Sequence, residues 1–129
     1  MSLPFTHKKL KDVKDSAPEF GVDDGMEARF AKKDLDAEET GVSHYRLKPG
    51  KRTPFGHKHE KAEEVYVVIA GSGRMKLDDE IIEVETLDAI RVSPEVIRAF
   101  EANDDGIEVL AVGARHDGDG EVIQGWWSE

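Results

Sequence analysis

Two histidines and a glutamate in the middle of the chain have the types and spacing of metal ligands. His57 and His59 flank one lysine, and side chains two residues apart lie on the same face of a β-strand. Their imidazoles can therefore reach one ion. Glu64 would face the other way in one unbroken strand, but the polar stretch 60–63 can bend the chain and turn it inward.

Two neutral imidazoles and a carboxylate, with other positions open, form the ligand set of non-haem iron, manganese, nickel or zinc sites. The chain has no cysteine, so histidine and carboxylate must hold any metal. The lack of cysteine also fits a reducing compartment, and we expect a cytoplasmic protein. The H-x-H spacing alone is weak evidence, because histidine pairs in strands also occur on surfaces and in cores.

The composition predicts one soluble domain. The chain has 129 residues, of which 38% are hydrophobic and 36% charged. No apolar run approaches the roughly 18 residues of a membrane helix, and the first twenty residues lack the apolar stretch of a secretory signal. Whether the first three residues are native is left open. A net charge of -10 argues against a nucleic-acid partner.

Basic residues nevertheless gather around the histidines. Six of them oppose the single acid Glu60 between positions 46 and 61: Arg46, Lys48, Lys51, Arg52, Lys58 and Lys61. Such an island forms either a solvated rim or a region that attracts an anionic ligand toward the pocket.

Short apolar segments separated by turn residues predict an all-β fold. The expected strands are 27–31, 42–47, 55–59, 64–69, 74–77, 81–84, 89–92, 97–102 and 107–112. Turns are expected at 49–50, 71–73, 77–80 and 103–106, which contain Gly, Pro, Asn or Asp. This pattern favours a closed barrel or jelly roll. Residues 1–26 are expected to form an arm across a domain of residues 27–129.

The region around the histidines closely resembles the first sequence motif of the cupin superfamily. In that motif a glycine leads to H-x-H, a glutamate follows, and a second glycine lies seven residues after the glutamate. Glu64 and Gly71 have this separation, whereas Gly50 lies one residue early. The resemblance is strongest over residues 41–113. It implies a small single-domain cupin of bacterial type, a double-stranded β-helix barrel, and His57, His59 and Glu64 as metal ligands.

The second cupin motif is present in order but altered in residue type. Leu87 and Glu95 stand where the motif has glycines, and Arg98 stands where it has the fourth metal ligand, a histidine. A guanidinium stays protonated and offers no lone pair to a metal. Arg98 therefore cannot be a ligand, and its charge repels a divalent cation.

Two outcomes follow from Arg98. In the first, a metal stays on His57, His59 and Glu64, and Arg98 grips a substrate carboxylate or phosphate. In the second, Arg98 pairs with Glu64 and replaces the metal's charge, which leaves a metal-free pocket. The residues expected to contact substrate are Arg98, Tyr66 and Arg52.

Other candidates carry weaker signals. His44 could turn inward as a replacement ligand, and Tyr66 could serve as a core residue or as a pocket donor. The segment 116–121 has acids but not the glutamate spacing of an EF-hand, so a solvated turn is favoured. Trp126 and Trp127 are expected to dock on the barrel or on a partner subunit.

The resemblance implies three functional hypotheses. The first is a metal-dependent enzyme of isomerase, decarboxylase or dioxygenase type that acts on a small, anionic molecule. The second is a metal-free cupin that binds or senses a small molecule, and the third is a structural dimer module. We expect a homodimer with no nucleic-acid or membrane partner.

Overall fold

The computed structural model describes residues 4–114 and 119–127, and it is almost entirely β. Two short 3-10 helices, η1 (Leu10–Asp12) and η2 (Ala17–Phe20), precede the strands. The strands are β1 (Met26–Phe30), β2 (Gly41–Leu47), β3 (Gly56–His59), β4 (Glu64–Leu77), β5 (Glu80–Glu85), β6 (Ala89–Val92), β7 (Arg98–Gly113) and β8 (Gly120–Ile123). Among these residues no helix has the length and hydropathy to span a membrane.

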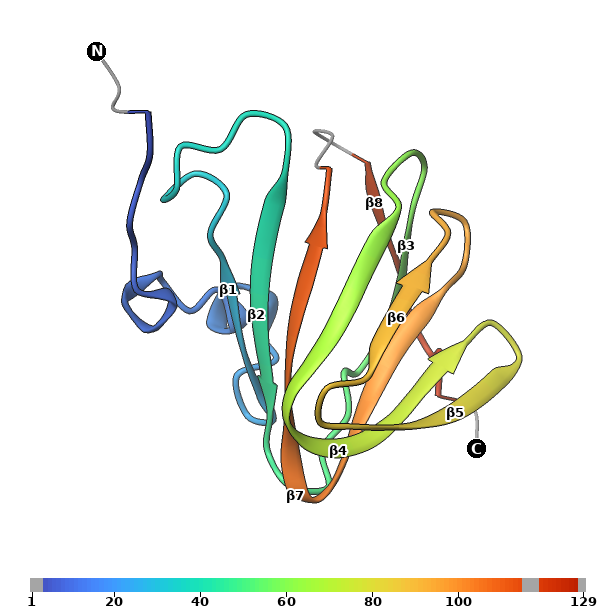
Figure 1. Cartoon of the computed structure of the whole chain (residues 1–129). Coiled ribbons are helices and arrows are strands. Elements are labelled where there is room, and N and C mark those ends of the chain that lie inside the picture. Colours follow the sequence, from blue (N-terminus) through green and yellow to red (C-terminus); the bar gives the residue numbers. More distant parts are fainter. Residues whose placement is uncertain (1–3, 115–118, 128–129) are drawn as a thin grey trace.

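The eight strands form one curled antiparallel sheet whose two halves, called here the two sheets, face each other and share the long strands β4 and β7 (Figure 1). One sheet has the order β1-β2-β7-β4-β6 and uses the second half of β7 with the first half of β4. The other has the order β5-β4-β7-β3-β8 and uses the remaining halves. The all-β jelly-roll prediction is therefore confirmed.

Two of the predicted turns are wrong, because β4 and β7 each bend without ending. Residues 71–73 lie inside β4 and residues 103–106 lie inside β7. Gly71 and Gly106 both adopt positive φ, and a Cβ on Gly71 would lie 2.0 Å from the Gly106 carbonyl oxygen. The glycines thus allow a β-bulge where the two strands cross closely. Each long strand consequently passes from one sheet to the other.

Alternation along β4 determines which side chains reach the interior. Glu64, Tyr66 and Val68 are buried, whereas Val65 and Ile69 are exposed. This period of two is the pattern of a strand with one face on the core. Apolar residues from both sheets form the core, including Met75, Phe100, Ile107 and Val109.

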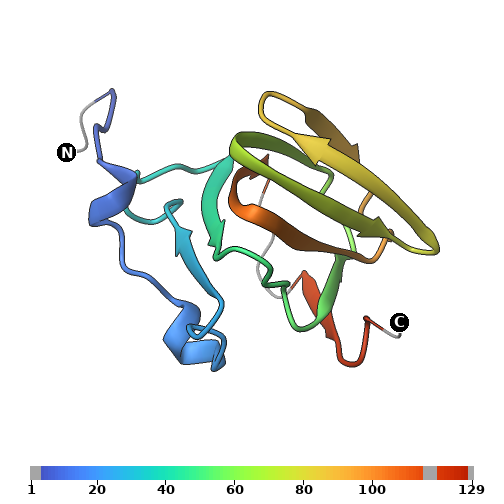
Figure 2. The ribbon, with the colours of Figure 1, turned by 90° about the horizontal axis from the view of Figure 1, so that it is seen from below.

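The N-terminal segment lies along the outer edge of the first sheet, beside β1 (Figure 2). The Asp15 carboxylate accepts hydrogen bonds from the backbone N–H groups of Ala17 and Ala28, at 3.0 and 2.9 Å. Ser16 donates its backbone N–H to the Ala28 carbonyl at 2.7 Å. These bonds hold η2 against the barrel. The first three residues lie outside the described part of the chain.

The C-terminal segment adds a strand that the sequence reading missed. β8 pairs with β3 in the register His57↔Val122 and His59↔Gly120. The two tryptophans that follow dock on the barrel, one of the two positions expected for them. Trp127 donates its indole N–H to the Thr53 carbonyl at 2.7 Å, and the Lys76 ammonium lies 4.4 Å from the Trp126 ring centroid.

Candidate metal centre

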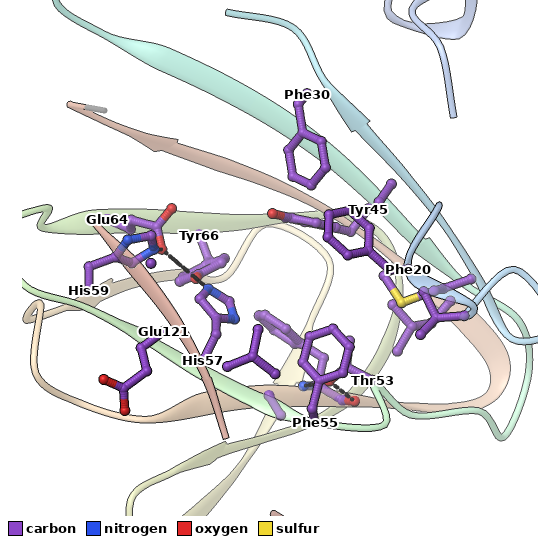
Figure 3. Close-up of a pocket in the computed structure, with 18 residues that line it drawn as sticks. Phe20, Phe30, Tyr45, Thr53, Phe55, His57, His59, Glu64, Tyr66 and Glu121 are labelled. Atoms are coloured by element: carbon purple, nitrogen blue, oxygen red, sulfur yellow. Dashed lines mark hydrogen bonds and ion pairs between the residues drawn. The ribbon is translucent and has the colours of Figure 1, made fainter. Parts of the chain in front are cut away.

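His57, His59 and Glu64 lie together inside the barrel (Figure 3). β3 presents both histidines from the same face, and Glu64 begins β4 after the bend at 60–63. One potential ligand atom from each residue lies within 4.8 Å of the other two. The change of direction expected between the histidines and Glu64 therefore occurs, and it is what brings the carboxylate to the imidazoles.

The Glu64 carboxylate is buried and surrounded by donors. Its Oε1 accepts hydrogen bonds from the Tyr66 hydroxyl at 2.7 Å and from Arg98 Nη2 at 3.0 Å. Nε2 of His59 lies 3.1 Å from the same oxygen. Burial raises the pKa of Glu64, but the contacts with His57, His59 and Tyr66 outweigh it and hold that pKa well below its usual range. Glu64 is thus an ionised carboxylate at neutral pH.

The ring nitrogens of His59 are well placed for a cation. Both are buried, and neither has a hydrogen bond of acceptable geometry among the described residues. Nε2 nevertheless faces Glu64 at 3.1 Å, and Nδ1 lies 3.3 Å from Oδ2 of Asp119. A buried nitrogen without a partner is costly unless a ligand satisfies it. A metal between Nε2 and Glu64 would do so, so the residues present fit such an ion.

His57 is held in the neutral form that a metal ligand requires. Burial lowers its pKa, the neighbouring Glu64 carboxylate opposes this, and the positive charge of Arg98 lowers it further. The result is a pKa below the usual histidine range. The imidazole therefore keeps a lone pair at neutral pH, and its Nε2 lies 3.7 Å from Glu64 Oε1.

Arg98 lies behind Glu64 rather than on the pocket wall. Its side chain is fully buried, and it stands opposite His57 in the β3–β7 pairing. Besides Glu64, its guanidinium donates to the Tyr66 hydroxyl at 3.1 Å and to the carbonyls of Pro94 and Val96 at 3.1 and 2.6 Å. The predicted Arg98–Glu64 pair is therefore present, while both histidines stay close to the carboxylate.

The Tyr66 hydroxyl forms hydrogen bonds with both charged groups, Glu64 and Arg98. Its side chain is almost completely buried and also lines the pocket, so it has both of the roles considered for it. Burial and the neighbouring Glu64 carboxylate raise the pKa of Tyr66 well above its usual range. The hydroxyl therefore keeps its proton and can donate to Glu64 while it accepts from Arg98.

Two sequence candidates lie away from this cluster. Arg52 donates to the Glu101 carboxylate, and its guanidinium lies 4.5 Å from the Trp127 ring centroid. His44 faces the outside of the first sheet, where its Nε2 lies 3.0 Å from Oε1 of Glu108. Neither side chain is among those that line the pocket. The structure therefore does not bring Arg52 or His44 to the three candidate ligands.

Asp119 is the residue of the site that the sequence reading missed. Its carboxylate accepts the backbone N–H groups of Glu60, Lys61 and Ala62 at 3.0, 2.8 and 3.1 Å, and it faces His59 Nδ1. Burial raises the pKa of Asp119, but the three backbone donors outweigh it and lower that pKa overall. Asp119 was assigned to a solvated turn with His116 and Asp117, which lie outside the described residues. The apolar pair 122–123 was the available signal for a strand.

Asp119→Asn should weaken metal binding by about 10- to 100-fold, because the carboxylate that orients His59 is replaced by a neutral amide. Calorimetric titration with Zn²⁺ measures the change. Asp79→Asn is the matched control, since Asp79 is an exposed carboxylate that does not line the cavity. Equal affinities for both variants would show that Asp119 does not position His59.

A cavity of about 260 Å³ opens beside the candidate ligands. His57, His59, Glu64 and Tyr66 lie at one end, and Phe20, Phe30, Tyr45 and Phe55 lie toward the other (Figure 3). None of the six basic residues between positions 46 and 61 lines this cavity. An electrostatic attraction by that island therefore acts from outside the pocket.

The model of the cupin domain family matches residues 43–113, and no curated protein matches the sequence. A cupin protein from Bacteroides fragilis is 22% identical, with a TM-score of 0.72 over 91% of this chain and 89% of that one.

Two further structures share the fold. KdgF from a Halomonas species is 16% identical, with a TM-score of 0.62 over 72% of this chain and 83% of that one. Oxalate decarboxylase from Bacillus subtilis is 22% identical, with a TM-score of 0.76 over 94% of this chain. The chain spans 32% of the length of that decarboxylase.

Proposed function

Because this chain belongs to the cupin family, we propose that it binds a small molecule in its barrel beside a divalent transition metal held by His57, His59 and Glu64. The observation that carries the proposal is the convergence of these three side chains, with a buried and unsatisfied Nε2 on His59. Iron, manganese, nickel and zinc suit this ligand set. Such a metal supplies a Lewis acid or, for iron, an oxygen-activating centre, as isomerase, decarboxylase or dioxygenase chemistry requires.

The residues of the chain have separable roles in this proposal. His57 supplies a neutral nitrogen, His59 supplies its buried Nε2, and Glu64 supplies an ionised carboxylate. Arg98 and Tyr66 hold that carboxylate in place by hydrogen bonds to its Oε1. An anionic head group on the ligand would face the metal, because no lysine or arginine lines the described pocket. The protein is proposed to act in the cytoplasm as a homodimer.

One observation favours a second candidate, a metal-free binding pocket. The Arg98 guanidinium already lies 3.0 Å from Glu64, so the carboxylate is paired without any ion. In that case the pocket binds or senses its ligand without metal chemistry. The two candidates differ in whether the folded protein takes up a metal.

Metal uptake can be measured on protein purified without a chelating resin. Elemental analysis is expected to find a transition metal, and an ion at 100 times its dissociation constant should raise the melting temperature by roughly 10 °C. His59→Ala should abolish the rise, whereas His7→Ala, in the N-terminal arm, should preserve it. Less than about a tenth of an equivalent of metal, together with no thermal shift in excess ion, would favour the metal-free pocket.

A further inference from the structure

The part of the cavity distant from the candidate ligands is aromatic. Phe20, Phe30, Tyr45 and Phe55, here called the aromatic end, line it together with aliphatic side chains such as Met26 and Leu47. The ring centroids of Phe20 and Phe30 are 6.3 Å apart, and those of Phe30 and Tyr45 are 6.0 Å apart, with both pairs edge to face. Such rings bind apolar and ring-shaped groups well.

Charged side chains line the cavity only at the end beside the candidate ligands. Among the described residues that line the cavity, the carboxylic acids are Glu64 and Glu121, and no lysine or arginine is present. A second anionic group on a ligand would therefore lie against apolar rings without a counter-charge. Burying an unpaired charge in this way is strongly unfavourable. The pocket thus disfavours small polyanions.

η2 and β1 build one wall of the aromatic end, and Tyr45 on β2 and Phe55 before β3 complete it. Phe20 lies on η2, and Met26, Ala28 and Phe30 lie on β1. The exposed fraction of Phe20 is 57%, so its ring lies at the rim, whereas Phe30 is half-buried. η2 and β1 therefore supply one of the walls against which the body of the ligand packs.

We infer that the ligand has one metal-binding head and an apolar body about the size of an aromatic ring, which packs on the aromatic end. The cavity of about 260 Å³ lies just below the usual range for ligand pockets, which favours one ring over a larger body. The head-group part rests on the proposed metal at His57, His59 and Glu64. The apolar-body part rests on the pocket wall alone.

The apolar-body part can be tested with hydroxamates that share one metal-binding head group and differ in the rest of the molecule. On Zn²⁺-loaded protein, benzohydroxamate should bind roughly 10- to 100-fold more tightly than acetohydroxamate, because the phenyl ring leaves water. Succinomonohydroxamate, which carries a second anionic group, should bind no more tightly than acetohydroxamate. Calorimetric titration gives the three affinities. Tighter binding of succinomonohydroxamate than of benzohydroxamate would overturn the inference.

A matched pair of variants tests whether the phenyl ring of the ligand binds at the aromatic end. Phe20→Glu should reduce the preference for benzohydroxamate over acetohydroxamate about tenfold, and the affinity for acetohydroxamate should stay the same. Phe5→Glu makes the same substitution at a phenylalanine whose exposed fraction is 69% and which does not line the cavity. It should change neither affinity. A preference that survives Phe20→Glu would mean that the aromatic end does not hold the ring.

A metal-free measurement separates this inference from the proposed function. Fluorobenzene should show saturable ¹⁹F line broadening with metal-free protein, fluoroacetate should not, and Phe20→Glu should weaken the broadening. If the protein takes up no metal but fluorobenzene binds in this way, the metal proposal fails and the apolar-body inference stands. If fluorobenzene shows no saturable broadening, and benzohydroxamate has no advantage over acetohydroxamate, the inference is overturned.

Discussion

Replacing Arg98 with methionine is expected to lower the free energy of unfolding by about 3–5 kcal/mol. The side chain is fully buried, and it donates to Glu64, to Tyr66 and to two backbone carbonyls. Methionine fills much of the space but leaves a buried carboxylate without its cation. Urea unfolding followed by tryptophan fluorescence measures the loss.

Arg91→Met is the control for this substitution. Arg91 pairs with Glu63 at 3.3 Å, but the exposed fractions of the two side chains are 63% and 60%. A surface pair of this kind contributes about 1 kcal/mol or less. A loss in Arg98→Met no larger than that in Arg91→Met would show that the Glu64–Arg98 pair does not stabilise the fold.

The same variant discriminates between the two functional candidates. In Arg98→Met a divalent ion is the remaining cation available to Glu64, so excess Zn²⁺ should restore more stability to this variant than it adds to the wild type. The double variant Arg98→Met with Glu64→Gln should be less destabilised than the sum of the two single variants, because no buried charge is left unpaired. Additive losses would contradict the pairing seen in the structure.

Arg98→His is expected to raise the affinity for Zn²⁺ by roughly a hundredfold. For effective dielectric constants of about 40 down to about 20, a divalent ion and a guanidinium about 6 Å apart repel by about 3 to 5.5 kcal/mol, and this repulsion is lost when the guanidinium is replaced. A hundredfold gain corresponds to the lower end of this range. The new imidazole also stands opposite His57, from which it can supply a fourth nitrogen. Calorimetric titration at a temperature well below unfolding gives the affinity.

The control is Arg91→His, which adds a histidine at an exposed position of β6. It should leave the affinity near that of the wild type. An unchanged affinity in Arg98→His would mean that the charge of Arg98 does not oppose a metal at His57, His59 and Glu64. A rise in both variants would indicate non-specific binding to added histidines.

Local sequence patterns predicted most of the strands and the three candidate metal ligands. The period of two in 64–69 predicted the inward face of β4, and the same period placed His57 and His59 on one face of β3. The altered second motif also identified Arg98 as the residue opposite the histidines. The strand predictions succeeded because they depend on a strand's own alternation, which neighbouring residues determine, whereas Arg98 was identified by its position in the second motif.

The two wrong turn predictions concern glycines whose structural role depends on a backbone segment that is distant in the sequence. Gly71 and Gly106 favour a turn when each is considered alone. In the structure Gly71 lies against the backbone of Gly106 and Ile107, and its missing side chain lets two long strands bend together. A local pattern cannot distinguish a strand that ends from one that bends, because the difference lies in which backbone approaches it.

The amino-acid sequence by itself identified His57, His59 and Glu64, because strand period places the two histidines on one face and the spacing of Glu64 and Gly71 resembles the first cupin motif. Tertiary structure alone decided their surroundings. It brought Asp119 to His59, placed Arg98 behind Glu64, and directed Arg52 to Glu101 instead of the pocket. These contacts join segments 34 to 60 residues apart, and only the packing of the two sheets determines which polar groups meet.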